Sequence, residues 1–181
     1  MRPEGSNDER TCQQRIVTDA PPDARDPSTW PAEVLARLQR VLDRSRRTGG
    51  QAVRDTFEHD ERRITAAEFV TFWNATRVKA MATAGGRGPH IAPVHADFVN
   101  GRLYSTVYEN AVRRRDLRTN SEVALTTWGP RGATAIVYGR ARELPDSLRE
   151  TRPGATGAAR RTVTLEIDVT RVYAMKGRPE A

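Results

Sequence analysis

The stretch that decides the fold runs from Thr76 to Tyr108 and reads TRVKAMATAGGRGPHIAPVHADFVNGRLYSTVY. Apolar runs of four to eight residues bounded by Gly, Pro and Asn predict β-strands. Asn100-Gly101 between two such runs indicates a tight hairpin turn. We therefore expect an antiparallel meander of three strands at the centre of the fold.

The second run of this meander, residues 89–99, alternates between two faces. One face carries Ile91, Pro93, His95 and Asp97, and the other carries Ala92, Val94, Ala96 and Phe98. Because Pro93 has no N–H to donate to a ladder, we expect this strand to be an edge, to be bulged or to border a ligand. His90 and His95 point to opposite faces and are therefore poorly placed to share a metal, so we predict no metal site.

A short helix is expected directly after the meander, over Asn110–Arg118. Asn110 is a capping residue, and Arg113, Arg114 and Arg115 fall in the first turn. Unpaired amides at a helix N-terminus, together with adjacent guanidinium groups, are suited to bind a phosphate. The sequence thus predicts an anion site at the start of this helix.

Three further strands are expected towards the C-terminus. They are Ser121–Trp128, Gly132–Leu144 with a bend or bulge at Gly139, and Arg161–Val172, where the alternation of apolar and polar residues is cleanest. Residues 145–161 are rich in Pro and Gly and indicate a long loop. Six strands joined mostly by hairpins favour a mainly β (α+β) fold, a small closed or partly closed barrel with flanking helices.

The N-terminal part divides into two segments. Residues 1–27 are polar and Pro-rich, so we expect a mobile tail. Residues 28–63 form a helical extension: an amphipathic helix opens near Pro31 and ends at Gly49-Gly50, and residues 51–63 are a connector. Residues 64–181 form the barrel domain, whose first helix opens with the capping box Thr65-Ala-Ala-Glu68.

Charge and composition restrict the function classes. The formal net charge is +7, but Lys79 and Lys176 are the only lysines among 30 basic residues, and the arginines are spread over nearly the whole chain. Aromatic residues make up only 6% and no nucleic-acid-binding motif is present, so we expect no nucleic-acid partner. The arginine row over residues 37–47 reads as a solvated helix face, with an acidic partner as the alternative.

The same composition argues against export and membrane insertion. Cys12 is the single cysteine, so no internal disulfide can form. The first fifteen residues contain no apolar run, and no later window approaches the ~20 apolar residues of a membrane span. We therefore expect a soluble cytoplasmic protein.

The order of segments along residues 64–175 resembles the pyridoxamine 5′-phosphate oxidase-like family, the FMN-binding split barrels. The segments that carry the resemblance are RVKAMAT, GGRGPHIAPV, NGRLYSTVY, AVRRRDLRTNSEVAL and AIVYGRAREL. The resemblance implies a six-stranded antiparallel split barrel, a homodimer with the cofactor in a cleft between the subunits, and an oxidoreductase acting on a small organic substrate. The residues that close the pyridoxamine phosphate site in the true oxidases are not recognisable, so a vitamin B6 enzyme is not expected.

The resemblance also implies a set of FMN contacts. The flavin ring meets the strand His90, Ile91, Ala92, Pro93 and Val94, largely through backbone groups; Ser105 and Thr106 approach the ribityl or phosphate end; Arg113, with Arg114 as its neighbour, holds the phosphate; and Thr134 is a polar flavin contact. Ala111 departs from the family, which commonly has serine at this position. No catalytic side chain is assigned.

Two alternatives to an FMN-dependent oxidoreductase stay open. The first is a reductase that uses the deazaflavin F-420. Relatives of the same fold bind this cofactor, whose phosphate and acidic tail suit a basic groove, and some relatives bind haem. The second alternative is a non-catalytic protein that holds flavin or haem. FMN is the preferred cofactor. Because a flavin or deazaflavin supplies the redox chemistry itself, the absence of a catalytic triad from the sequence is consistent with either cofactor.

Overall fold

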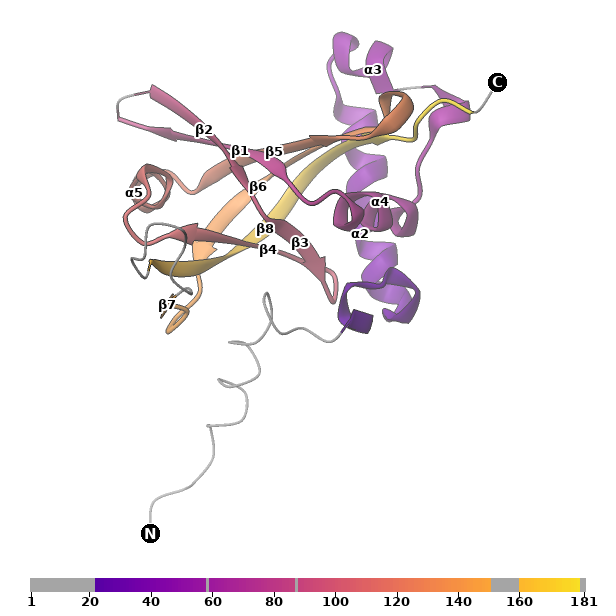
Figure 1. Cartoon of the computed structure of the whole chain (residues 1–181). Helices are drawn as coiled ribbons and strands as arrows, with labels where there is room; N and C mark the ends of the chain where they lie inside the picture. The colour runs from indigo at the N-terminus through magenta and orange to yellow at the C-terminus, as the bar shows by residue number, and fades with distance from the viewer. Residues whose placement is uncertain (1–21, 58, 87, 151–159, 180–181) are drawn as a thin grey trace.

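The computed structural model describes residues 22–57, 59–86, 88–150 and 160–179. A strongly curved antiparallel sheet forms a half-barrel (Figure 1). Helices α2 (Ala32–Thr48), α3 (Gln51–Phe57) and α4 (Ala66–Ala75) lie on one side of it, and α5 (Val112–Thr119) lies at the opposite end. The predicted fold class, a split barrel with flanking helices, is confirmed.

Within the described residues, the sheet contains eight strands. They are β1 (Lys79–Gly85), β2 (Gly88–Val94), β3 (Ala96–Val99), β4 (Arg102–Tyr108), β5 (Glu122–Trp128), β6 (Thr134–Glu143), β7 (Arg149–Glu150) and β8 (Arg161–Met175). Their order is β2-β1-β5-β6-β8-β4-β3, and β7 pairs only with β8. Because β2 continues into β3 through a single residue, the chain itself links the two ends of this order and curls the sheet.

The count exceeds the expected six by two: the second strand of the meander divides at His95, and the short strand β7 lies within residues 145–161, which were expected to form a loop. The Ser105 hydroxyl donates a hydrogen bond to the His95 carbonyl oxygen at 2.8 Å and fixes this break. Among the described strands β2 pairs only with β1, where Pro93 lies opposite Ala80. The expectation that Pro93 occupies an edge strand is therefore confirmed.

Two predicted backbone features are also confirmed. Asn100 and Gly101 have φ angles of 47° and 77°, the left-handed pair that a tight hairpin turn between β3 and β4 requires. The β6–β8 register shifts between Tyr138 and Gly139, which is the predicted bulge. A side chain at residue 139 would collide with the Asp168 carbonyl oxygen, so glycine is needed there.

The core lies between the sheet and helices α2 and α4. Phe69, Trp73 and Phe98 pack with ring centroids 5.5 to 6.1 Å apart, and the Trp73 indole donates to the Ala96 carbonyl oxygen at 2.9 Å. The predicted capping box positions α4: the Thr65 amide donates to Glu68 Oε2 at 2.8 Å. No helix of the described ranges is both long and apolar enough to span a bilayer.

The structure corrects two N-terminal expectations. Residues 22–27, assigned to a mobile tail, contain the 3₁₀ turns η1 (Pro22–Arg25) and part of η2 (Pro27–Thr29), and Ala24 accepts hydrogen bonds from Trp30 and Asn100. The rest of that predicted tail lies outside the described residues. The connector 51–63 contains α3 and the 3₁₀ turn η3 (Asp60–Arg62). A further 3₁₀ turn, η4 (Pro130–Gly132), precedes β6.

Candidate functional site

Helix α5 carries the arginine cluster and packs against β1 (Figure 1). Its N-cap is Ala111, and no side chain caps its first turn. The expectation that Asn110 is the cap is therefore wrong, because the helix begins one residue later than predicted. The amides of the first turn have no side-chain acceptor at the cap.

Arg113 lies in the first turn of α5 and is half-buried. Its Nε atom is buried and has no hydrogen-bond partner within the described parts of the chain. Burial lowers the pKa of Arg113 below its ordinary value, because the charged form loses solvation. A buried cationic donor without an acceptor is unfavourable, so this position suits an anion brought by a ligand.

Arg114 has a different environment from its neighbour. Its Nε and Nη2 atoms donate to the two carboxylate oxygens of Glu143 at 2.8 and 2.6 Å, and Nη1 donates to the Glu109 carbonyl oxygen. The hydrogen bonds from Arg114 lower the pKa of Glu143. Arg114 thus fastens α5 to the end of β6, while Arg115 is exposed.

One turn along α5, Asp116 organises a polar cluster. Its Oδ2 accepts a hydrogen bond from the Thr83 hydroxyl at 2.7 Å and lies 2.8 Å from His90 Nδ1. The hydrogen bond from Thr83, with a further contribution from His90, holds the pKa of Asp116 below its usual value. Gly85 is required beside this carboxylate, because a Cβ at residue 85 would overlap Asp116 Oδ1.

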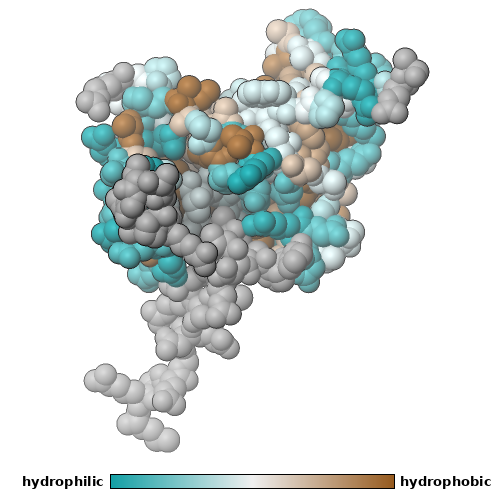
Figure 2. All heavy atoms as spheres, in the orientation of Figure 1, coloured by the Kyte–Doolittle hydropathy of each residue, from teal (hydrophilic) through white to brown (hydrophobic). Residues whose placement is uncertain are grey.

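The remaining residues of β2 lie on two faces, as the alternation predicted. Ile91 and Pro93 are exposed, Ala92 is half-buried and Val94 belongs to the core. Ile91 shares its face with Val78 and Trp128, which are 50% and 68% exposed, while Ile91 itself is 72% exposed. These three side chains edge a largely apolar hollow of about 410 Å³, which we call the apolar face. Apolar atoms gather over β1, β2 and β5 in Figure 2.

Three predicted contacts lie on β4 and β6. Ser105 is fully buried, and its hydroxyl donates a hydrogen bond to the His95 carbonyl oxygen at the break between β2 and β3. Thr106 is half-buried and lies opposite Thr164 of β8. Thr134 begins β6 opposite Trp128, next to the apolar face, and its hydroxyl donates to the Thr127 carbonyl oxygen at 3.2 Å.

Sequence reasoning missed Asp116, Thr83 and Trp128. Asp116 could have been found, because it lies three residues after Arg113 and shares a helix face with it. Thr83 could not, because its proximity to Asp116 depends on how α5 folds back onto β1. Trp128 was predicted only as a strand end, and its exposure follows from the strand register.

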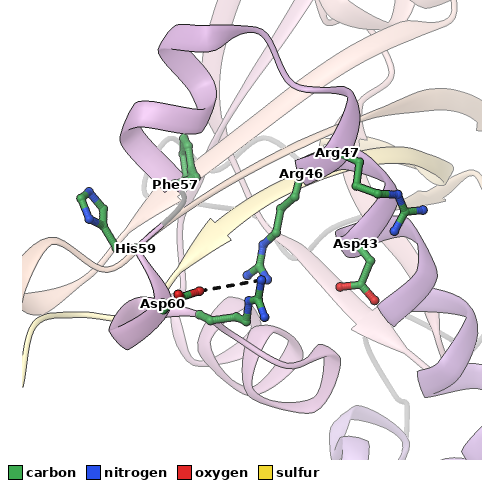
Figure 3. Close-up of a pocket in the computed structure, with 7 residues that line it drawn as sticks. Asp43, Arg46, Arg47, Phe57, His59 and Asp60 are labelled. Carbon is green, nitrogen blue, oxygen red and sulfur yellow. Dashed lines mark ion pairs between the residues drawn. The ribbon is translucent and has the colours of Figure 1, made fainter.

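A second hollow is lined by residues of α2, α3 and the segment that follows α3 (Figure 3). The helices α2 and α3 lie at the other end of the sheet from α5 (Figure 1). Its volume is about 610 Å³ and its lining is Asp43, Arg46, Arg47, Phe57, His59, Asp60 and Arg63. Asp60 lies 3.9 Å from the Arg63 guanidinium group. Because two carboxylates stand among the arginines, this hollow is electrostatically mixed. It does not give the arginine row a uniformly positive surface.

Comparison with solved structures identifies the fold. A conserved hypothetical protein from Mycobacterium tuberculosis superimposes with a TM-score of 0.54 at 14% identity, over 68% of this chain and 94% of that one. An FAD-binding protein from Mesorhizobium loti matches with a TM-score of 0.49 at 21% identity, over 64% of this chain and 96% of that one. A Listeria innocua protein named for pyridoxamine 5′-phosphate oxidase matches with a TM-score of 0.47 at 13% identity, over 59% and 94%.

No protein-family profile matches the chain, and no curated protein is similar to it in sequence. The Mycobacterium tuberculosis match, with a TM-score above 0.5, demonstrates a shared fold and, at 14% identity, nothing about ligands. The split-barrel resemblance inferred from the sequence is confirmed at that level.

Proposed function

We propose that this split-barrel protein binds the phosphate of a flavin or deazaflavin cofactor at the start of α5 and is an oxidoreductase acting on a small organic substrate. The observation that carries the proposal is Arg113, whose buried Nε has no acceptor within the described residues. A phosphate oxygen would supply that acceptor and would also face the first-turn amides of the helix.

The other proposed contacts follow from the environment of each residue. The edge of β2 from His90 to Val94, which no other described strand pairs, offers backbone groups to the ring. Thr106 offers a hydroxyl, and the part-buried Thr134 hydroxyl, which donates to the Thr127 carbonyl oxygen, can still accept a hydrogen bond. Ser105 and Arg114 already bond to protein groups, so we assign them the support of the β2–β3 break and of α5. When bound, the cofactor supplies hydride transfer, and the protein supplies position and exclusion of water.

We propose FMN as the cofactor and the deazaflavin F-420 as the alternative. Arg113 provides a phosphate site for both, and the general excess of arginine suits the acidic tail of the deazaflavin without excluding FMN. The absorption spectrum and mass of the molecule that copurifies with the protein distinguish these two cofactors from each other and from haem. A protein that copurifies with none and binds neither FMN nor F-420 on addition would contradict the proposal.

Turnover separates an enzyme from a binding protein of the same fold. The proposal predicts that NAD(P)H reduces the bound FMN, or that F-420 enters already reduced, and that a defined organic acceptor then oxidises it. A cofactor that binds but is neither reduced nor oxidised at a useful rate would support the alternative, a protein that only holds the cofactor.

A further inference from the structure

We infer that His90 is the proton-transferring residue of this site and that Asp116 is its positioning residue. The inference rests on the proposed function, because it concerns the side chain of a residue whose backbone we place beside the cofactor. It assigns to the His90 imidazole a role that backbone contact alone does not require.

The geometry selects one tautomer of His90. Asp116 Oδ2 lies 2.8 Å from Nδ1 and already accepts from the Thr83 hydroxyl. An ionised carboxylate only accepts hydrogen bonds, so Nδ1 must carry a hydrogen and donate it. Nε2 is then the atom that can hold or release a second proton, and it has no hydrogen-bond partner within the described residues.

The Asp116 carboxylate is held rigidly. It is 6% exposed, its Oδ2 accepts a hydrogen bond from the Thr83 hydroxyl, and its Oδ1 lies where a Cβ at residue 85 would collide with it. Such a carboxylate fixes both the orientation and the tautomer of a histidine. The imidazole nevertheless keeps 33% of its side-chain surface exposed, which distinguishes it from a histidine that only fills the core.

The His90–Asp116 pair and the proposed phosphate site share helix α5. Asp116 follows Arg113 by three residues, so both project from the same face of α5. His90 opens the β2 segment that we assign to the ring. A cofactor held at Arg113 and along β2 therefore passes the exposed part of the imidazole.

The proposed step balances as the reduction of a polarised double bond. A bound cofactor in its reduced form would supply one hydride to one atom of the bond, and the His90 imidazolium would supply one proton from Nε2 to the other atom. The imidazolium becomes neutral imidazole, and water returns the proton. Among the described residues, the charged groups near the His90 imidazole and the Asp116 carboxylate are Asp116 itself and Arg115, whose positive charge lies near that carboxylate.

The first test needs no turnover. Because the chain has three histidines, ¹H–¹⁵N spectra of the imidazole nitrogens resolve into three rings. We expect His90, identified by its loss in His90→Gln, to be the Nδ1–H tautomer without cofactor and to shift when FMN is added. Asp116→Asn and the milder Thr83→Val should reduce the tautomer preference. An Nε2–H tautomer, or no response to FMN, would overturn the inference.

The second test measures the reaction with 2-cyclohexen-1-one, which takes up one hydride and one proton. Protein saturated with FMN is reduced with dithionite, and its oxidation by the enone is followed at several pH values. Positioned acid–base groups contribute on the order of 10²- to 10⁴-fold. His90→Gln should therefore slow the oxidation by about 100-fold or more and abolish the decline of rate with rising pH.

His95→Gln is the matched control, because His95 faces the other side of the strand and bonds the Arg77 carbonyl oxygen. It should leave rate and pH profile unchanged. A His90→Gln protein that keeps the parental rate, or a parent that the enone does not oxidise, overturns the inference while leaving cofactor binding intact. A parent that binds no FMN overturns the proposed function instead, and the inference with it.

Discussion

Three consecutive arginines in α5 have three different environments. Arg113 has a buried Nε without an acceptor in the described residues, Arg114 is paired through two atoms with Glu143, and Arg115 is exposed. The difference arises because successive side chains of a helix point about 100° apart and meet different neighbours. Only Arg113 combines burial with an unused donor.

Arg114 should contribute to stability rather than to cofactor affinity. Arg114→Ala is expected to cost about 0.5 to 1 kcal/mol at pH 7, the upper part of the range for partly exposed ion pairs. The pKa of Glu143 is lower in the folded protein than in the unfolded chain, where it is ~4.3. The contribution of the ion pair to the free energy of unfolding is therefore complete at pH values above the unfolded-state pKa, and it is lost as the pH falls through the folded-state pKa. Urea denaturation at pH 7 and below pH 4 measures it.

The control for Arg114→Ala is Arg140→Ala, which breaks the more exposed pair with Glu122. This change should cost less than Arg114→Ala at neutral pH. If the deficit of Arg114→Ala did not shrink in acid, the pairing with Glu143 would not be its cause.

At the residue scale, the sequence predicted that α5 begins with basic residues, but it did not predict which arginine pairs with a carboxylate and which keeps an unused donor. Arg114 and Glu143 are 29 residues apart, and their pairing depends on where β6 ends relative to α5. The sequence likewise does not indicate that Asp116, among many charged residues, contacts Thr83 and His90. Local patterns do not contain such long-range contacts.

At the scale of elements, the short 3₁₀ turns η1 and η2 contact α4, β3 and the β3–β4 turn. Trp30 donates to the Ala24 carbonyl oxygen at 3.0 Å, the Asn100 amide donates to it at 2.9 Å, and Asn74 donates to the Arg25 carbonyl oxygen. The segment 22–30 thus fastens α4 and the β3–β4 turn together. The sequence does not indicate this role, because the segment takes part through its backbone carbonyl oxygens, which accept these hydrogen bonds whatever the side chains are.

Two truncations test the role of this segment. A chain beginning at Pro22 keeps the contacts of Ala24 and Arg25 and should match the full chain in melting temperature and FMN affinity. A chain beginning at Ser28 loses them and should be less stable by about 1 to 3 kcal/mol, because each net backbone hydrogen bond contributes about 0.5 to 1.5 kcal/mol. Equal melting temperatures for the two truncations would refute a structural role for residues 22–27.

Elements with a local signal were predictable, and those set by tertiary contacts were not. The Asn100-Gly101 turn, the capping box at Thr65 and the bulge at Gly139 each follow from the backbone preferences of a few residues. The break at His95 depends on the Ser105 hydroxyl, ten residues along the chain. Helix α3 lies in a mixed, charged segment and packs its Phe57 against Tyr173 of β8.

At the scale of the whole molecule, no described part of the chain covers the apolar face. Ile91 and Trp128 expose more than two thirds of their surface. Contiguous exposed patches of large apolar side chains are uncommon on monomeric proteins and usually mark an interaction site. We propose that a second copy of the chain covers this face. Such a homodimer would place Thr134, which pairs with Trp128 at the rim of the face, close to the subunit boundary.

Sedimentation velocity at micromolar concentration should therefore show a dimer. Trp128→Asp should shift it towards the monomer, because a carboxylate would be buried at the interface without a partner. Arg40→Asp, on the exposed side of α2, should have no such effect. A parent that sediments as a monomer with cofactor bound would count decisively against the dimer.

The phosphate site at Arg113 is the central claim, and calorimetric titration of FMN and riboflavin tests it most directly. A charged hydrogen bond contributes about 1.5 to 3 kcal/mol, so Arg113→Ala should weaken FMN binding by roughly ten- to a hundredfold. Arg115→Ala should be nearly silent, and riboflavin, which lacks the phosphate, should bind weakly to the parent and be almost indifferent to both changes. Equal losses for Arg113→Ala and Arg115→Ala, or the same loss with riboflavin as with FMN, would contradict the claim.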